Sequence, residues 1–278
     1  MRRERPDAIH LDRKCVGLTQ NGDSVTIGFE RGEPATAPLV IGADGVQSRA
    51  RLAVFGADRP EFTGIVAWRV LVPRDRVPQG IKMDVGTNWV GPGGHCVHYP
   101  VRGGALLNFV GLLERDDWRV ESWTVQGSAD EFCNDFRNWH PDIHATIRSG
   151  DTPYKWALFA RPPMPSWTEG RVTLLGDACH PMLPMMAQGA AQSVEDGAAL
   201  ATLLKAMPDD IASALARYEA VRKPRATKLQ QASAANRSRF HLPDGEAQRA
   251  RDEALATSGD RSIANIGWLY VHDAAEAL

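Results

Sequence analysis

A glycine–acid pair stands directly after a short apolar run, where a side chain can meet a ligand. Gly176-Asp177 follows Val172 to Leu175. Ligands of open α/β sheets bind at the carboxyl ends of strands, and a carboxylate there accepts hydrogen bonds from ribose-type hydroxyls. A helix of tiny residues begins near Gly189-Ala190, and its free N–H groups favour a pyrophosphate or an anionic ring. Taken alone, Gly-Asp is more often an ordinary turn in which Asp177 only caps the chain.

Two further groups of residues are candidates for chemistry. Asp44-Gly45 also follows an apolar run and opens the pattern Asp-Gly-x-x-Ser-x-x-Arg, which ends at Arg51. His95 and Tyr99 are four residues apart in an expected strand, so they share one face while His98 points to the other. A histidine that titrates near neutral pH suits proton transfer. The alternative is a hydrogen-bonded histidine and a packing tyrosine under the sheet.

The remaining histidines and cysteines predict no metal site. His140 and His144 are spaced i, i+4, but Pro141 lies between them and no third ligand is evident. His180 is expected to brace its loop. The four cysteines are scattered and are expected to be reduced thiols of a cytoplasmic protein.

The elements that must position these residues alternate between β and α character. Residues 25–29 and 39–41 predict strands, the second fully buried, and a long helix is expected from 189 to 206. Pro224 should kink or interrupt the helix that follows 209–210, and residues 242–262 look weakly ordered. Further strands are expected at 65–72, 96–101, 106–113, 154–159 and 171–175. One further helix is expected to begin at the capping pattern Ser128-Ala129-Asp130-Glu131.

Composition excludes several classes of protein. The 278 residues carry a net charge of −2, which leaves no basic field for nucleic acid. No stretch approaches the ~20 consecutive apolar residues of a membrane span, so no membrane partner is expected. The charged start, Met1 to Asp7, lacks the apolar core of a secretory signal.

Taken together, the motifs resemble one family in colinear order over nearly the whole chain. The chain resembles the FAD-dependent aromatic hydroxylases of the 4-hydroxybenzoate hydroxylase type, and within them the salicylate 1-hydroxylase and 3-hydroxybenzoate 6-hydroxylase branch. The matching stretches are Ile41 to Val46, Trp68-Arg69, Gly91 to His95, Tyr99 to Val101, Gly104 to Val110, Gly170 to Ala178, His180-Pro181, Ala187 to Ala190, Glu195-Asp196, Tyr218-Glu219 and Trp268 to Tyr270.

The resemblance implies a mixed α/β fold with an incomplete Rossmann-like FAD-binding domain. Residues 1–57 would form part of that domain and carry the Asp-Gly motif. Residues 58–169 would form an inserted β-sheet substrate domain. Residues 170–278 would supply the rest of the FAD-binding domain, with the Gly-Asp motif and the carboxyl-terminal helices. Homodimerisation through those helices is compatible with the sequence.

The resemblance also implies roles for the candidate residues. Gly176 and Asp177 would bind the ribityl or ribose hydroxyls of FAD, and Gly189 and Ala190 would face the pyrophosphate and the flavin. Pro184 would pack over the isoalloxazine ring. Asp44 would contact FAD and the nicotinamide cofactor, with Arg51 supporting it.

His95 and Tyr99 would reach a phenolic substrate. A base is useful there, because loss of the phenol proton raises the electron density of the ring that a flavin hydroperoxide attacks. The implied activity is a monooxygenase of aromatic catabolism that uses FAD, NADH or NADPH, and O2 to hydroxylate a small aromatic acid. A lipid or quinone substrate is the least favoured alternative, because the tail from Arg251 to Leu278 lacks a broad apolar face.

One expected part of the family's fold is absent from the sequence. No Gly-x-Gly-x-x-Gly occurs, although relatives open with a βαβ unit that carries it. Roughly a hundred residues, the size of that unit and its helices, are expected to be missing, as in a fragment, a natural truncation or half of a pair. A second interpretation is therefore a non-catalytic remnant that binds an aromatic ligand or a partner protein but not FAD.

Overall fold

The computed structural model describes residues 8–120, 122, 124–258 and 267–274. They divide into a first unit, from residues 1–60, 161–234 and 266–278, and a second, from 61–160 and 235–265. These units group two segments differently from the expected domains, whose bounds stay a prediction. Residues 161–169 belong to the first unit because Thr168 and Glu169 pair with the strand before Gly176. Residues 235–258 belong to the second unit, whereas 267–274 belong to the first.

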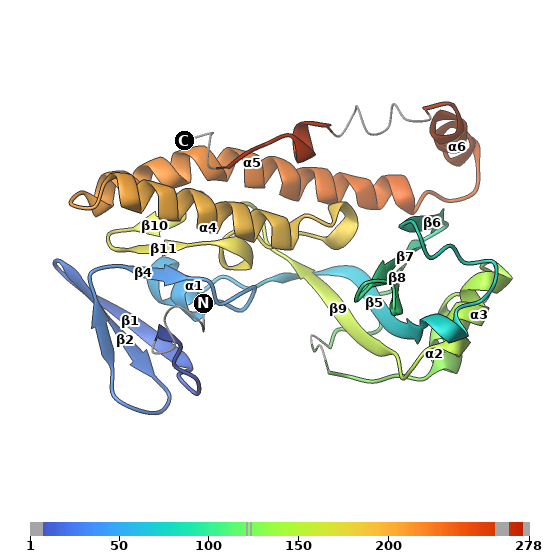
Figure 1. The fold of residues 1–278 in the computed structure, drawn as a ribbon, viewed down its shortest axis with the longest axis horizontal. Helices are drawn as coiled ribbons and strands as arrows, with labels where there is room; N and C mark the ends of the chain where they lie inside the picture. The colour runs from blue at the N-terminus through green and yellow to red at the C-terminus, as the bar shows by residue number, and fades with distance from the viewer. Residues whose placement is uncertain (1–7, 121, 123, 259–266, 275–278) are drawn as a thin grey trace. The chain divides into compact units, whose positions relative to one another are not determined.

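Two small sheets build the first unit (Figure 1). One is antiparallel in the order β1-β2-β3, and the other has the order β10-β11-β4. Their bounds are β1 (Cys15–Asn21), β2 (Ser24–Phe29), β3 (Ala35–Ala37), β4 (Val40–Gly42), β10 (Thr168–Glu169) and β11 (Val172–Leu174). Because β11 runs parallel to β4, with Leu174 opposite Gly42, both strands end at the same edge. The Asp-Gly and Gly-Asp motifs therefore leave the sheet from one edge.

The strand expected at 39–41 is less buried than its sequence predicts. Val40 and Gly42 are buried, but the side chain of Ile41 is 40% exposed. The reason is topological, because β4 is the edge strand of its sheet among the described residues.

Helices complete the described part of the first unit, and α4 lies beside α5 (Figure 1). They are α1 (Arg49–Phe55), α4 (Gly189–Ala206) and α5 (Ile211–Phe240). Only the part of α5 up to residue 234 belongs to the first unit. Their core contains Leu174, Leu200, Leu215 and Tyr218. Pro224 does not interrupt α5. A proline inside a helix costs about 3 kcal/mol, which the buried stripe on both sides of it offsets.

The second unit is an antiparallel sheet of five strands in the order β6-β7-β8-β5-β9. The strands are β5 (Glu61–Pro73), β6 (Thr87–Gly91), β7 (Gly94–Val101), β8 (Leu106–Glu114) and β9 (Tyr154–Ala160). Helices α2 (Ala129–Asp135) and α3 (Pro141–Ser149) cover one face, where Trp68 stacks on Phe132 with ring centroids 5.0 Å apart. The other face carries the residues alternating with that core.

Helix boundaries in the second unit follow local chemistry. Ser128 caps α2 by accepting a hydrogen bond from the N–H of Glu131, as its spacing predicts. Helix α2 ends at Asp135, well before Pro141, which is instead the first residue of α3, where a proline loses no hydrogen bond. The segment expected to be weakly ordered contains α6 (Glu246–Ser258), and residues 259–262 lie outside the described residues. Among the described residues, no helix is long and apolar enough to cross a membrane.

Candidate functional site

The turn after β11 presents a free carboxylate. Gly176 begins a 3₁₀ turn, Gly176–Ala178, with φ +61°, and an added Cβ would lie 2.5 Å from Ser193 Oγ. Glycine is required there, because the turn packs directly on α4. The Asp177 side chain is exposed and makes no hydrogen bond to any described residue. The loop still withdraws its carboxyl from water enough to raise its pKa, and His180 opposes that rise. Such an acceptor suits hydroxyl donors.

The beginning of α4 lies next to this carboxylate. A Cβ built on Gly189 would lie 3.9 Å from Asp177 Oδ1 and would meet nothing closer. The packing of the described protein therefore does not require a glycine at 189, whereas close approach of a ligand would. Gln188 provides no side-chain cap, so the first N–H groups of α4 are free, and Ala190 is exposed. Together with Asp177, this open helix start fits the hydroxyls and pyrophosphate of FAD.

The loop that carries Pro184 is anchored from behind. Pro184 is exposed and begins a 3₁₀ turn, Pro184–Met186. Ser233 Oγ donates to the Leu183 carbonyl at 2.5 Å, and Gln230 Nε2 donates to the Pro181 carbonyl at 2.9 Å. These bonds from α5 fix the backbone that precedes the helix start. The exposed proline thus follows a backbone segment that is hydrogen-bonded to α5.

The structure gives Asp44 and Arg51 other contacts than a cofactor. Asp44 caps α1, accepting from Ser48 Oγ at 2.5 Å and from the backbone N–H of Arg49 at 2.6 Å. Arg51 is buried, pairs with Asp58, and donates from Nη1 to the Ala178 carbonyl at 3.3 Å. Arg51 therefore joins the Asp-Gly motif to the Gly-Asp turn. This placement gives Arg51 a bracing role, while direct contact of Asp44 with a cofactor stays a prediction.

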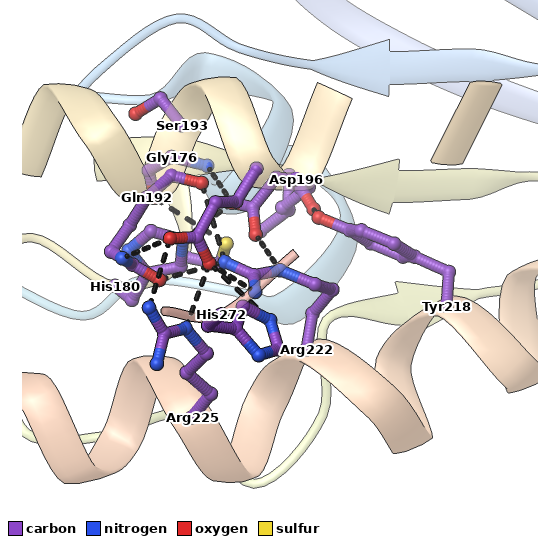
Figure 2. A network of polar contacts seen from close by, with 12 residues as sticks. Gly176, His180, Gln192, Ser193, Asp196, Tyr218, Arg222, Arg225 and His272 are labelled. Carbon is purple, nitrogen blue, oxygen red and sulfur yellow. Dashed lines mark hydrogen bonds and ion pairs between the residues drawn. The ribbon is translucent and has the colours of Figure 1, made fainter. Parts of the chain in front are cut away.

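A buried polar network supports the Gly-Asp turn (Figure 2). Asp196 on α4 is fully buried and accepts from the N–H of Gly176 at 2.9 Å and from Arg222 Nε at 2.9 Å. His180 Nε2 lies 2.5 Å from Asp196 Oδ2, so His180 braces the loop as its position predicts. Although burial opposes ionisation, these partners hold the pKa of Asp196 below its usual value. The network ties β11, α4 and α5 together directly behind Asp177.

Part of this network has the residue types of a metal site, but the carboxylate of Asp196 has no free oxygen. Ligand atoms of Cys179, His180 and Asp196 lie within 4.8 Å of one another. Both oxygens of Asp196 already accept hydrogen bonds, from Gly176, His180 and Arg222. Burial raises the pKa of the Cys179 thiol well above its usual value, which disfavours a thiolate ligand. The cluster is best explained as structural hydrogen bonding.

In the second unit, His95 and Tyr99 share the face of β7 opposite the helices. His98 points the other way, where its ring stacks on Phe109. The two candidates differ in accessibility, because His95 is 3% exposed and Tyr99 is 42% exposed. The Tyr99 hydroxyl makes no hydrogen bond within the part of the chain that the structure describes. It is therefore available to a ligand on this face.

The expected titration of His95 near neutral pH is corrected by its surroundings. Burial, together with the charge of His241, lowers the pKa of His95 to about 3. His95 is thus neutral at pH 7 and, taken alone, is a weak proton acceptor. Its Nδ1 lies 2.7 Å from Nε2 of His241, a residue that follows α5 and that sequence reasoning missed.

Arg69 is a second functional candidate that sequence reasoning left without a role. Arg69 pairs across β8 with Val110, which pairs with Val97, so Arg69 shares the face of His95 and Tyr99. Its Nε donates to the buried Asn108 Oδ1 at 2.7 Å. Its terminal nitrogens bind none of the described residues, and it lines a cavity of about 500 Å³ with Gln126, Tyr154 and Trp156. The sequence does contain a signal for this residue, because Arg69 is the one charged residue in the otherwise apolar run from Ile65 to Val72.

Comparisons with known proteins agree with these features. Residues 1–233 match the family described as FAD binding domain. The chain is 36% identical over 270 residues to 3-amino-4-hydroxybenzoate 2-monooxygenase PtnB3 of Streptomyces platensis, covering 97% of this chain and 67% of that protein. It is 39% identical over 234 residues to 6-hydroxynicotinate 3-monooxygenase of Pseudomonas fluorescens, covering 82% of this chain and 60% of that protein.

Solved structures give the same result. A salicylate hydroxylase substrate complex matches with a TM-score of 0.83 and 28% identity, covering 98% of this chain and 71% of that one. HpxO of Klebsiella pneumoniae, solved with FAD and uric acid, matches with a TM-score of 0.79 and 26% identity, covering 91% and 65%. The chain thus spans about two-thirds of the length of these relatives. The mixed α/β chain belongs to the FAD binding domain family of FAD-dependent aromatic hydroxylases.

Proposed function

We propose that this chain is the major part of a flavoprotein monooxygenase that hydroxylates a small aromatic acid bearing a ring hydroxyl. In the overall reaction, Ar–H, O2, NAD(P)H and H⁺ give Ar–OH, NAD(P)⁺ and H2O. FAD, reduced by NAD(P)H, supplies the activation of O2 when it is bound. The observation that carries the proposal is the free Asp177 carboxylate beside the open start of α4. The cysteines are free thiols, which suits a cytoplasmic enzyme.

The first unit would hold the cofactor. Asp177 would accept hydrogen bonds from ribityl or ribose hydroxyls, and the N–H groups of Gly189 and Ala190 would bind the pyrophosphate. Pro184 would pack against the ring system. Asp44 and Arg51 would keep the neighbouring helix and turn in place.

The second unit would hold the substrate. The exposed Tyr99 hydroxyl would orient the ring hydroxyl, and His95 would accept its proton. Arg69, with its Nε fixed on Asn108, would present its two terminal nitrogens to the carboxylate, a geometry that suits bidentate binding. The named substrates of two relatives, 3-amino-4-hydroxybenzoate and 6-hydroxynicotinate, combine a carboxylate with a ring hydroxyl.

The test is product formation by the purified chain loaded with FAD. NADH or NADPH would be supplied with salicylate, 3-hydroxybenzoate, 4-hydroxybenzoate or 6-hydroxynicotinate, and hydroxylated products would be identified by mass spectrometry. We expect one acid to be hydroxylated and Arg69→Met to raise its KM much more than that of its carboxamide analogue. A chain that retains FAD but hydroxylates none of these acids would contradict the proposed substrate class. A chain that retains no FAD would favour the non-catalytic alternative.

A further inference from the structure

His95 is the end of a chain of hydrogen bonds inside the second unit. His95 Nδ1 lies 2.7 Å from His241 Nε2, and His241 Nδ1 lies 3.0 Å from Glu114 Oε1. Arg237 Nε donates to the same Glu114 oxygen at 2.9 Å. The N–H of Gly93 donates to the His241 carbonyl at 3.2 Å, which fixes the backbone of His241. The four side chains therefore form one connected series.

The ionisation state of Glu114 determines which ring nitrogens of His241 and His95 carry hydrogen. Burial opposes ionisation of Glu114, but hydrogen bonds from Arg237 and His241 hold its pKa below the usual value. An ionised carboxylate only accepts hydrogen bonds, so His241 must carry its hydrogen on Nδ1. Burial lowers the pKa of His241, although Glu114 opposes this, so its ring is neutral at pH 7 and its Nε2 accepts. His95 must then donate from Nδ1, which leaves its Nε2 with a lone pair.

The same series gives a protonated His95 a way to move its charge. His95 is almost fully buried, and Phe240 packs edge-on to its ring at 5.3 Å, so a cation there lacks solvent. Glu114 lies beside His241 rather than beside His95. A positive charge is therefore better accommodated on His241.

We propose that Glu114 and His241 are positioning residues that hold His95 in the Nδ1–H form, and that His241 takes over the positive charge when His95 accepts a proton. In that step the substrate O–H bond breaks and an N–H bond forms at His95 Nε2. The Nδ1–H bond of His95 breaks, and an N–H bond forms at His241 Nε2. His241 then carries the positive charge against Glu114. This inference rests on the proposed role of His95 as proton acceptor.

Tautomers in the resting protein test the positioning claim without any turnover. Long-range ¹H–¹⁵N correlation spectra of the ¹⁵N-labelled chain at pH 7 distinguish protonated from unprotonated ring nitrogens. His95→Gln and His241→Gln assign the two rings by loss of signal. We expect both rings to carry hydrogen on Nδ1 only. His95 with hydrogen on Nε2 in the unchanged protein would overturn the proposal.

Two replacements at Glu114 separate its acceptor oxygen from its charge. Glu114→Gln keeps an acceptor, so both rings should keep their tautomers. Glu114→Leu removes it, so both should become tautomer mixtures, and unchanged tautomers would refute the proposal. His98→Gln, which removes the buried histidine on the opposite face, should leave both rings as they are. Near-ultraviolet circular dichroism verifies that each variant is folded. If Glu114→Leu does not fold, the tautomers of Glu114→Gln are compared with those of the unchanged protein.

Kinetics of the FAD-loaded chain test the charge transfer. His241→Gln should lower kcat at least tenfold, because proton transfer by a positioned group contributes ~10²–10⁴-fold, and should change KM little. The loss should shrink as pH rises toward the pKa of the substrate hydroxyl, whereas a purely structural defect would persist. A loss independent of pH would contradict the relay. Full activity of His95→Gln would instead refute the proposed role of His95, while the tautomers still decide the positioning claim.

Discussion

Replacing Gly176 by alanine tests how the Gly-Asp turn packs against α4. The residue has φ +61°, and a new Cβ would lie 2.5 Å from Ser193 Oγ and 3.2 Å from Ser193 Cβ. The left-handed conformation costs an alanine about 1–2 kcal/mol, and overpacking at a close contact typically costs about 1–3 kcal/mol. We therefore expect Gly176→Ala to lower the free energy of unfolding by about 2–5 kcal/mol.

A double-mutant cycle measured by urea unfolding separates the two contributions. Ser193→Ala alone should cost about 0.5–1.5 kcal/mol, because it removes the hydrogen bond from Ser193 Oγ to the Gly189 carbonyl. Combined with Gly176→Ala it should recover about 1–2 kcal/mol, because the closest contact disappears while the conformational strain stays.

Gly45→Ala is the matched control for backbone strain. Gly45 has φ +78°, but nothing lies within 4 Å of an added Cβ. Its replacement should cost only the conformational part, about 1–2 kcal/mol, and should not couple to Ser193→Ala. If Gly176→Ala costs no more than Gly45→Ala, or shows no coupling to Ser193, then the turn does not pack directly on α4.

Two further predictions concern buried charge. Arg222→Met leaves the fully buried Asp196 without its guanidinium partner and should lower the free energy of unfolding, measured with urea, by about 3–5 kcal/mol. An unchanged urea midpoint would contradict the network in Figure 2. Because burial and His241 lower the pKa of His95 to about 3, the unfolded chain binds a proton below pH ~6.5 that the native chain does not. Stability should therefore fall as pH drops from ~6.5 toward 3, by up to about 1.4 kcal/mol per pH unit from this residue. His95→Gln should remove that part of the slope, and an unchanged slope would show that His95 titrates normally.

Local signals in the sequence predicted the elements that position the cofactor residues. The run of small residues between Gly189 and Ala206 forms α4 as expected, because Pro208 lies just beyond its C-cap, Met207, and no proline or β-branched cluster interrupts it. The strand pair β7 and β8 follows from alternation and from the Arg102 to Gly104 turn. In contrast, Pro224 does not interrupt its helix, because tertiary packing along α5 outweighs one lost hydrogen bond.

The surroundings of the candidate site could not be predicted from the sequence. The hydrogen bond between His95 and His241 joins residues 146 positions apart, and no local pattern identifies such a partner. The same holds for Arg51, whose contact with the Ala178 carbonyl joins residues 127 positions apart. The low pKa of His95 follows from burial, which depends on the end of α5 packing near β7. Residue type and spacing therefore identified candidates, while tertiary contacts determine their chemistry.

Retention of FAD by the purified chain tests the central claim most directly. The chain would be incubated with excess FAD, desalted, and examined by visible absorption, together with Asp177→Ala and with Asp209→Ala, an exposed acid elsewhere, as control. We expect flavin bands in the unchanged chain and in the control. Asp177→Ala should weaken binding about 10- to 150-fold, because hydrogen bonds to a charged group contribute about 1.5–3 kcal/mol. A colourless unchanged chain, or equal retention by Asp177→Ala, would contradict the claim that Asp177 and the start of α4 hold the cofactor.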